Sequence, residues 1–169
     1  PLKDATAVAE RINEKFPGAA SAKDGSVFVG ANQLKDVAQF LRDDPGLACD
    51  YLSNLTSVDW NDHFDVVYHL YSIRREDGPV TLKVSTDREN PAVPSVTPVW
   101  QGANLQEREV WDMMGIKFDG HPNLKRILMW DGYQGFPLRK DFKEPYFEEM
   151  QKPFDQRWPD GKFVRGEER

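Results

Sequence analysis

The residues best suited to chemistry in this sequence are concentrated in one segment, residues 107–142. It reads EREVWDMMGIKFDGHPNLKRILMWDGYQGFPLRKDF. Glu107, Glu109 and His121 are of the types that serve as general acids and bases. Arginines and lysines in the same segment can form ion pairs or bind a partner. The candidate chemistries are therefore proton transfer and electrostatic binding.

Each of these acid–base residues also has a structural interpretation. Glu107 lies beside aromatic residues and can act as an acid of raised pKa. Such a carboxylate more often meets a basic group from a following loop, and we expect this. His121 stands in an Asp-Gly-His-Pro turn signature, followed by Pro122. It has no metal-ligand spacing with the other histidines, so we expect it to fix a tight loop by hydrogen bonding.

The charged residues around them allow two interpretations that can both hold. Arg108 and Asp112 are four residues apart and can pair on the surface of a helix. An internal ion network would hold two loops to that helix. Alternatively, the charges form a polar rim around an aromatic contact surface. The basic members are Lys125, Arg126, Arg139 and Lys140; the acidic ones are Glu107, Glu109, Asp112 and Asp141; the rings belong to Trp111, Trp130, Tyr133 and Phe136.

Composition excludes several classes of function. The chain has 169 residues, about the size of one domain, and a net charge of −6, which argues against nucleic-acid binding by the whole domain. It has no long apolar run that would span a membrane, and no apolar signal core, so we expect a cytoplasmic location. Cys49 is the single cysteine, which excludes an internal disulfide and a cysteine-held cluster.

Hydrophobic periodicity predicts the elements that position these residues. We expect an α+β fold in two layers, with helices packed on a mostly antiparallel sheet. Apolar spacing predicts helices over 5–16, 34–41 and 103–114, the last capped by Gly115. Strands are predicted at 26–29, in a three-stranded meander over 54–86, and at 126–129; residues 90–98 form a connector.

We expect residues 1–142 to form one domain and residues 143–169 to form an extended tail. Pro145, Pro153 and Pro159 prevent a long helix there. The tail is nevertheless rich in aromatic residues, which disordered linkers lack. A ring-bearing segment without its own core is best explained by docking on another surface, although packing on its own domain is the alternative.

The segment 107–142 resembles the thirty-kilodalton subunit family of respiratory complex I, which in bacteria is the C subunit of NADH-quinone oxidoreductase. The match is long and gapless. It comprises Glu107, Arg108, Glu109, Asp112, Gly115, Phe118, Gly120, His121, Pro122, Leu124, Arg126, Ile127, Leu128, Gly135, Pro137, Leu138, Arg139, Lys140, Asp141 and Phe142. Met114, Lys125 and Trp130 depart from the usual pattern without removing a charged residue.

The resemblance implies a cofactor-free subunit of the peripheral arm, on the cytoplasmic side of the membrane. It would contact the large quinone-site subunit and the iron–sulfur subunits, with NADH, FMN, iron–sulfur clusters and quinone all bound by these partners. Its residues for docking would be Glu107, Arg108, Glu109, Trp111, Asp112, Gly115, His121, Pro122, Arg126, Pro137, Arg139, Lys140 and Asp141. The alternatives are the equivalent subunit of a ferredoxin-linked or membrane-bound hydrogenase-type complex, and a stand-alone acid–base enzyme using Glu107 or Glu109 with His121.

Overall fold

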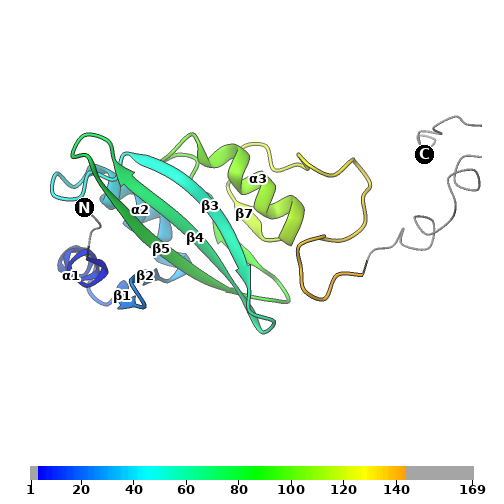
Figure 1. Ribbon diagram of the computed structural model, residues 1–169, viewed down its shortest axis with the longest axis horizontal. Helices are drawn as coiled ribbons and strands as arrows, with labels where there is room; N and C mark the ends of the chain where they lie inside the picture. Colours follow the sequence, from blue (N-terminus) through cyan, green and yellow to red (C-terminus); the bar gives the residue numbers. More distant parts are fainter. Residues whose placement is uncertain (1–3, 144–169) are drawn as a thin grey trace, which may run out of the picture.

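The computed structural model describes residues 4–143 of the chain (Figure 1). Almost all of the predicted tail, residues 143–169, lies outside the described residues. Its docking on another surface therefore stays a prediction.

Helices α1 (Ala5–Lys15) and α2 (Leu34–Asp43) form where the apolar spacing predicts them. The Asp4 carboxylate begins α1 by accepting the N–H groups of Thr6 and Ala7, each at 3.3 Å. Each helix buries one apolar stripe against the sheet, as amphipathic helices do. The stripe residues are Val8, Ala9 and Ile12 in α1, and Leu34, Val37, Ala38 and Leu41 in α2.

The sheet has five strands in the order β1-β2-β5-β4-β3. Their bounds are β1 Ala20–Lys23, β2 Ser26–Val29, β3 Tyr51–Asp59, β4 His63–Ser72 and β5 Asp77–Asp87. The predicted meander is confirmed as β3-β4-β5, and the two-layer α+β class is confirmed with it. Strand β1 and the parallel pairing of β2 with β5 were not predicted, because the exposed strand β1 carries no apolar pattern.

One face of the sheet carries most of the core. Alternate side chains of β4, from Phe64 to Leu70, are fully buried and pack with the apolar stripes of α1 and α2. Figure 1 shows α2 behind the strands β4 and β5, while the opposite face has no helix over it in the described part of the chain. The period-2 alternation of the sequence thus identifies the core face correctly.

Helix α3 (Ala103–Met114) packs beside β3, one of the two edge strands of the sheet. It ends at Gly115, whose φ of 72° and ψ of 18° make the left-handed cap that was predicted. The segments on either side of α3 pair as a small parallel sheet of β6 (Ala92–Pro94) and β7 (Lys117–Asp119). The predicted connector over 90–98 therefore contains a short strand.

The predicted strand over 126–129 is wrong. These residues form a bend without ladder pairing, because their N–H groups point to one carboxylate of α3 instead of to a neighbouring strand. Among the helices of residues 4–143, none has the length and apolar character needed to cross a membrane.

Candidate functional site

The C-terminal end of α3 organises the segment that was singled out in the sequence. A helix leaves its last four carbonyl groups without intrahelical donors. The carbonyl of Trp111 accepts the N–H of Gly115 at 2.8 Å, and that of Met113 accepts the N–H of Leu138 at 3.0 Å. The backbone of the following loops therefore satisfies two of the four groups.

Two arginines satisfy the other two carbonyls. Arg126 Nη1 donates to the carbonyl of Asp112 at 3.1 Å, and Arg139 Nε donates to the carbonyl of Met114 at 2.6 Å. Positive charge at this end of a helix is favourable because the helix dipole is negative there. The charged residues of the segment thus stabilise the helix end and the loops that follow it.

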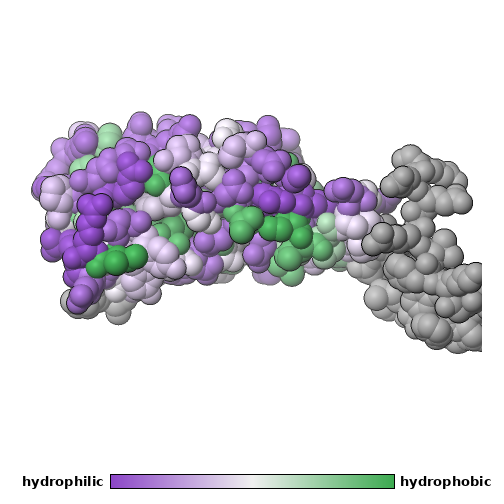
Figure 2. Space-filling view, turned by 90° about the horizontal axis from the view of Figure 1, so that it is seen from above, coloured by the Kyte–Doolittle hydropathy of each residue, from purple (hydrophilic) through white to green (hydrophobic). Residues whose placement is uncertain are grey.

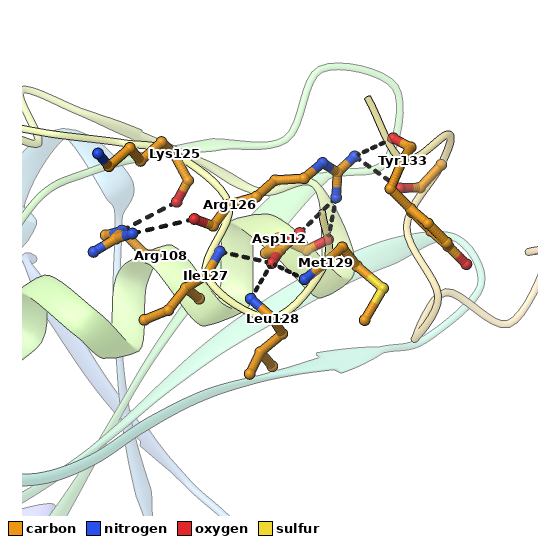
Figure 3. A network of polar contacts seen from close by, with 9 residues as sticks. Arg108, Asp112, Lys125, Arg126, Ile127, Leu128, Met129 and Tyr133 are labelled. Carbon is orange, nitrogen blue, oxygen red and sulfur yellow. Dashed lines mark hydrogen bonds and ion pairs between the residues drawn. The ribbon is translucent and has the colours of Figure 1, made fainter. Parts of the chain in front are cut away.

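The carboxylate of Asp112 holds the loop after β7 to α3 (Figure 3). One oxygen, Oδ2, accepts three consecutive backbone N–H groups, from Ile127, Leu128 and Met129, at 2.9, 2.7 and 2.9 Å. The other, Oδ1, accepts Arg126 Nη1 at 2.5 Å. Burial by itself raises the pKa of Asp112, but these hydrogen bonds outweigh it and bring the pKa below its usual value.

Arg126 extends this network to the next loop. Its Nη2 donates to the carbonyls of Tyr133 and Gly135, at 2.9 and 3.1 Å. The guanidinium also lies within 6 Å of the ring centroids of Trp111, Tyr133 and Phe136. Arginine suits this position because its planar group has several donors and stacks on rings.

Arg108 does not form the expected surface pair with Asp112. Asp112 is completely buried, and Arg108 donates instead to the carbonyls of Lys125 and Arg126, at 3.0 and 3.1 Å. The two residues still act on the same loop, from opposite sides (Figure 3). The i,i+4 spacing did not predict these contacts, because only the tertiary fold brings the loop over residues 125–129 against Arg108 and Asp112.

Arg139 lies between two aromatic rings. Its guanidinium carbon is 5.1 Å from the ring centroid of Phe64 and 4.8 Å from that of Phe136. Burial lowers the pKa of Arg139 relative to its ordinary value. A Cβ atom on Gly115 would come within 2.7 Å of both Phe136 and Arg139, so this position needs glycine for space as well as for its positive φ.

A second ion network fixes the end of the described chain to the sheet. Arg88 bonds to Asp59 of β3 and to Asp141, the latter at 2.9 Å, and the N–H of Lys140 donates to Asp59 at 3.0 Å. Burial alone would raise the pKa of Asp59, but the hydrogen bonds from Arg88, Lys140 and Asn61 lower it to about 2. Arg88 and Asp59 were not predicted from sequence, since no spacing links them to the segment 107–142.

Glu107 does not meet a basic group from a following loop, as had been expected. Its side chain is fully buried and accepts the Ser95 hydroxyl and the Val96 N–H, both at 2.7 Å, from the connector that precedes α3. Burial raises the pKa of Glu107 to about 7, and the two hydrogen bonds only partly oppose this. The carboxylate therefore joins the connector to α3.

His121 uses both ring nitrogens within its own surroundings. Its Nδ1 accepts the N–H of Asn123 at 3.0 Å, so Nε2 carries the proton donated to the carbonyl of Asn104, also at 3.0 Å. Glu107 and His121 thus have separate partners, and Glu109 is exposed on α3. The structure does not bring the three residues together as an acid–base site. Within residues 4–143 there is also no group of three or more His, Cys, Asp or Glu side chains that could hold a metal.

The predicted aromatic contact surface is wrong in part. Tyr133 is buried, and Trp111 and Phe136 are half-buried around the Arg126 and Arg139 guanidinium groups, whereas Trp130 is 58% exposed. The other apolar side chains exposed on the same loops are aliphatic. They are Ile127, Leu128 and Leu138, the last 62% exposed. We call Ile127, Leu128, Trp130 and Leu138 the apolar loop residues. Figure 2 shows hydrophobic residues gathered on the half of the molecule that carries α3.

The fold and the site together define a class of protein: an α+β domain whose buried charges stabilise its own loops and whose exposed apolar side chains suit contact with another protein. A family model described as the respiratory-chain NADH dehydrogenase 30 kDa subunit matches residues 27–148. The chain belongs to this family.

Similar proteins agree with this assignment. The chain is 48% identical over 146 residues to the C subunit of NADH-quinone oxidoreductase of Roseiflexus sp. (strain RS-1), covering 82% of this chain and 83% of that protein. It is 43% identical over 134 residues to the C 2 subunit of NADH-quinone oxidoreductase of Rhizobium meliloti (strain 1021), covering 78% and 72%.

Solved structures share the fold. The trypsin-resistant fragment of Nqo5 aligns with a TM-score of 0.55 and 28% identity, covering 69% of this chain and 99% of the fragment. A chain of the membrane-bound sulfane sulfur reductase, an archaeal respiratory membrane complex, aligns with a TM-score of 0.64 and 21% identity over 95% of each chain.

Proposed function

We propose that this chain is a peripheral-arm subunit of NADH-quinone oxidoreductase, which holds neighbouring subunits in place while electrons pass from NADH to quinone. The observation that carries this proposal is the use of the charged groups of the segment 107–142. Asp112, Arg126 and Arg139 bind backbone groups and rings of the same chain. These residues shape a surface instead of converging on a substrate.

The exposed side chains of the same segment are the proposed docking surface. Ile127 and Leu128 sit on the loop that Asp112 holds to α3, and Leu138 is held there by its own N–H, which donates to the carbonyl of Met113. Apolar side chains gathered on fixed loops are typical of a protein–protein contact. The predicted site residues then act by positioning: they determine where the loop side chains meet a partner.

The proposed partners follow from membership of the family. They are the large quinone-site subunit and the iron–sulfur subunits, which would hold quinone and the iron–sulfur clusters; NADH and FMN would likewise be bound by other chains. We place the subunit on the cytoplasmic side of the membrane, in contact with lipid only through the complex. The tail from residue 143 would dock on these partners.

The second candidate is the equivalent subunit of a related membrane-bound respiratory complex. A chain of the sulfane sulfur reductase complex shares this fold at 21% identity, so the fold is found in both kinds of complex. The masses of the chains that co-purify with a tagged copy separate the two candidates. Subunits of an NADH-oxidising module support the first, and hydrogenase-type subunits support the second.

Arg139→Ala tests the proposed role in assembly. We expect less assembled complex, with the NADH:quinone reductase rate per assembled complex unchanged, because Arg139 fixes the loop that bears Leu138. Native gel electrophoresis and the reductase assay measure the two quantities. Arg74→Ala is the matched control, since the Arg74 side chain is 81% exposed and forms an ion pair with Asp50 at the far end of the sheet. A variant at Arg139 that assembles fully would contradict the role.

A further inference from the structure

A groove runs between the outer edge of β3 and the C-terminal half of α3. Its volume is about 410 Å³. Val58 and Trp60 line it from the strand, Val110 and Met113 line it from the helix, and Leu138 lines it from the loop that follows. Trp60 is 51% exposed, and Val58 and Leu138 are exposed as well, so apolar surface faces solvent along this groove.

Along the groove, β3 has backbone groups that the sheet does not use. β3 is an edge strand, paired with β4 alone among residues 4–143. The N–H of Leu55 bonds to the Gln106 side chain of α3, whereas the N–H of Trp60 bonds to His63 across the hairpin. Because N–H direction alternates along a strand, Leu55, Ser57 and Asp59 point their backbone groups away from β4.

Ser57 is a residue left open by this arrangement. Gln106 satisfies the donor of Leu55, but within residues 4–143 no turn, loop or side-chain hydrogen bond uses the backbone of Ser57. An unpaired strand edge is a template for another extended chain. Here the template is flanked by apolar side chains of both the strand and the helix.

We propose that this groove receives an extended, uncharged segment of a neighbouring subunit, which adds as a short strand to the edge of β3 and hydrogen-bonds to Ser57. This proposal rests on the proposed function. Strand addition is a recurring way to bind a peptide: the main-chain bonds give affinity, and the flanking pockets select side chains. The segment's side chains lie against Val58 and Trp60 on one face and against Val110 and Met113 on the other.

The charges of the groove favour an uncharged occupant. Asp59 is already paired with Arg88, and the remaining charges, Glu109 and Lys140, are of opposite sign. The first residues of the chain's own tail fit this environment poorly, because Glu144, Glu148 and Glu149 are acidic and Pro145 lacks an N–H. A segment from another subunit is therefore the better match.

Ser57→Pro tests the strand addition. Proline removes the outward N–H and puts its ring into the groove. It keeps the hydrogen bonds of β3 to β4, because proline is tolerated on an edge strand when its nitrogen faces away from the sheet. Ser57→Ala is the matched control, because it keeps the N–H and removes only the hydroxyl. Thermal unfolding of each isolated full chain shows whether the fold is retained.

The readouts are incorporation into the complex and hydrogen exchange at Ser57. We expect Ser57→Ala to assemble like the wild type and Ser57→Pro, while folded, to bind about tenfold or more weakly, in line with one lost hydrogen bond and a steric block. The wild-type Ser57 amide should exchange slowly in the complex and fast in the isolated chain. If Ser57→Pro does not fold, the hydrogen exchange of the wild-type Ser57 amide, compared between complex and free chain, tests the strand addition by itself.

Other outcomes overturn the inference. Normal assembly of a folded Ser57→Pro variant would contradict the strand addition. Equal hydrogen exchange of the wild-type Ser57 amide in the complex and in the free chain would contradict it as well. Slow exchange in the free chain that is lost on truncation after residue 143 assigns the groove to the chain's own tail, and a dimer that Ser57→Pro disrupts assigns it to a second copy. If the wild-type chain joins no NADH-quinone oxidoreductase at all, the proposed function fails instead.

Discussion

Replacing Asp112 by asparagine removes the charge that holds the loop after β7 to α3. The carboxylate is completely buried and has four donors, the N–H groups of residues 127–129 and the Arg126 guanidinium. Asparagine keeps one acceptor oxygen but turns an NH2 group toward a donor. Breaking one side of a buried charge pair costs about 3–5 kcal/mol. For a chain of this length, that loss lowers Tm by roughly 6–20 °C.

Denaturant and thermal unfolding of Asp112→Asn measure this loss. Asp119→Asn is the control, because Asp119 forms an exposed ion pair with Lys117 at 3.2 Å and such pairs contribute about 0–1 kcal/mol. Hydrogen exchange adds a local test: the amides of residues 127–129 should exchange much faster in Asp112→Asn alone. A stability loss no larger than that of the control, or unchanged exchange at these amides, would refute the role assigned to Asp112.

Three further changes test other parts of the site. The Glu107 pKa of about 7 lies above its ordinary value of 4.5, so the folded state keeps a proton that the unfolded state releases. Stability should therefore fall by about 3 kcal/mol as pH rises from 4.5 to 7, and Glu107→Gln should remove this slope in unfolding titrations. Gly115→Ala should cost at least about 1 kcal/mol, seen as a lower Tm, because of its positive φ and the contact with Phe136. The Asp59 pKa is lowered to about 2, so its stabilisation is present above pH 3.8 and is lost as pH falls toward 2; Asp59→Asn should flatten this acid-side loss in the same titrations.

Local pattern was enough to find most of the elements. The helices α1, α2 and α3 and the meander β3-β4-β5 were predicted because side chains repeat every 3.6 residues in a helix and every two in a strand. The glycine at the end of α3 was also found from sequence, since a left-handed cap favours that residue. These features depend on neighbours in the chain, which the sequence displays directly.

The hydrogen-bond partners of the buried polar groups could not be predicted from the local sequence pattern. Residues 126–129 have the composition of a strand, yet a buried carboxylate of α3 takes their N–H groups. Glu107 bonds to the connector before α3, and Arg88 joins β3 to Asp141, although nothing in the spacing links them. A buried polar group must find a partner, and which one it finds depends on the segments that packing brings beside it.

The sequence by itself therefore determined the layers, the core face and the family, because these follow from periodicity and from a long ungapped motif. Only the tertiary structure decided which charges are buried and which backbone groups stay open. Asp112 looks like a surface carboxylate in the sequence, since its i,i+4 spacing from Arg108 suggests an exposed pair, yet it is fully buried in the fold. The open edge at Ser57 is likewise invisible until the strand order leaves β3 outermost.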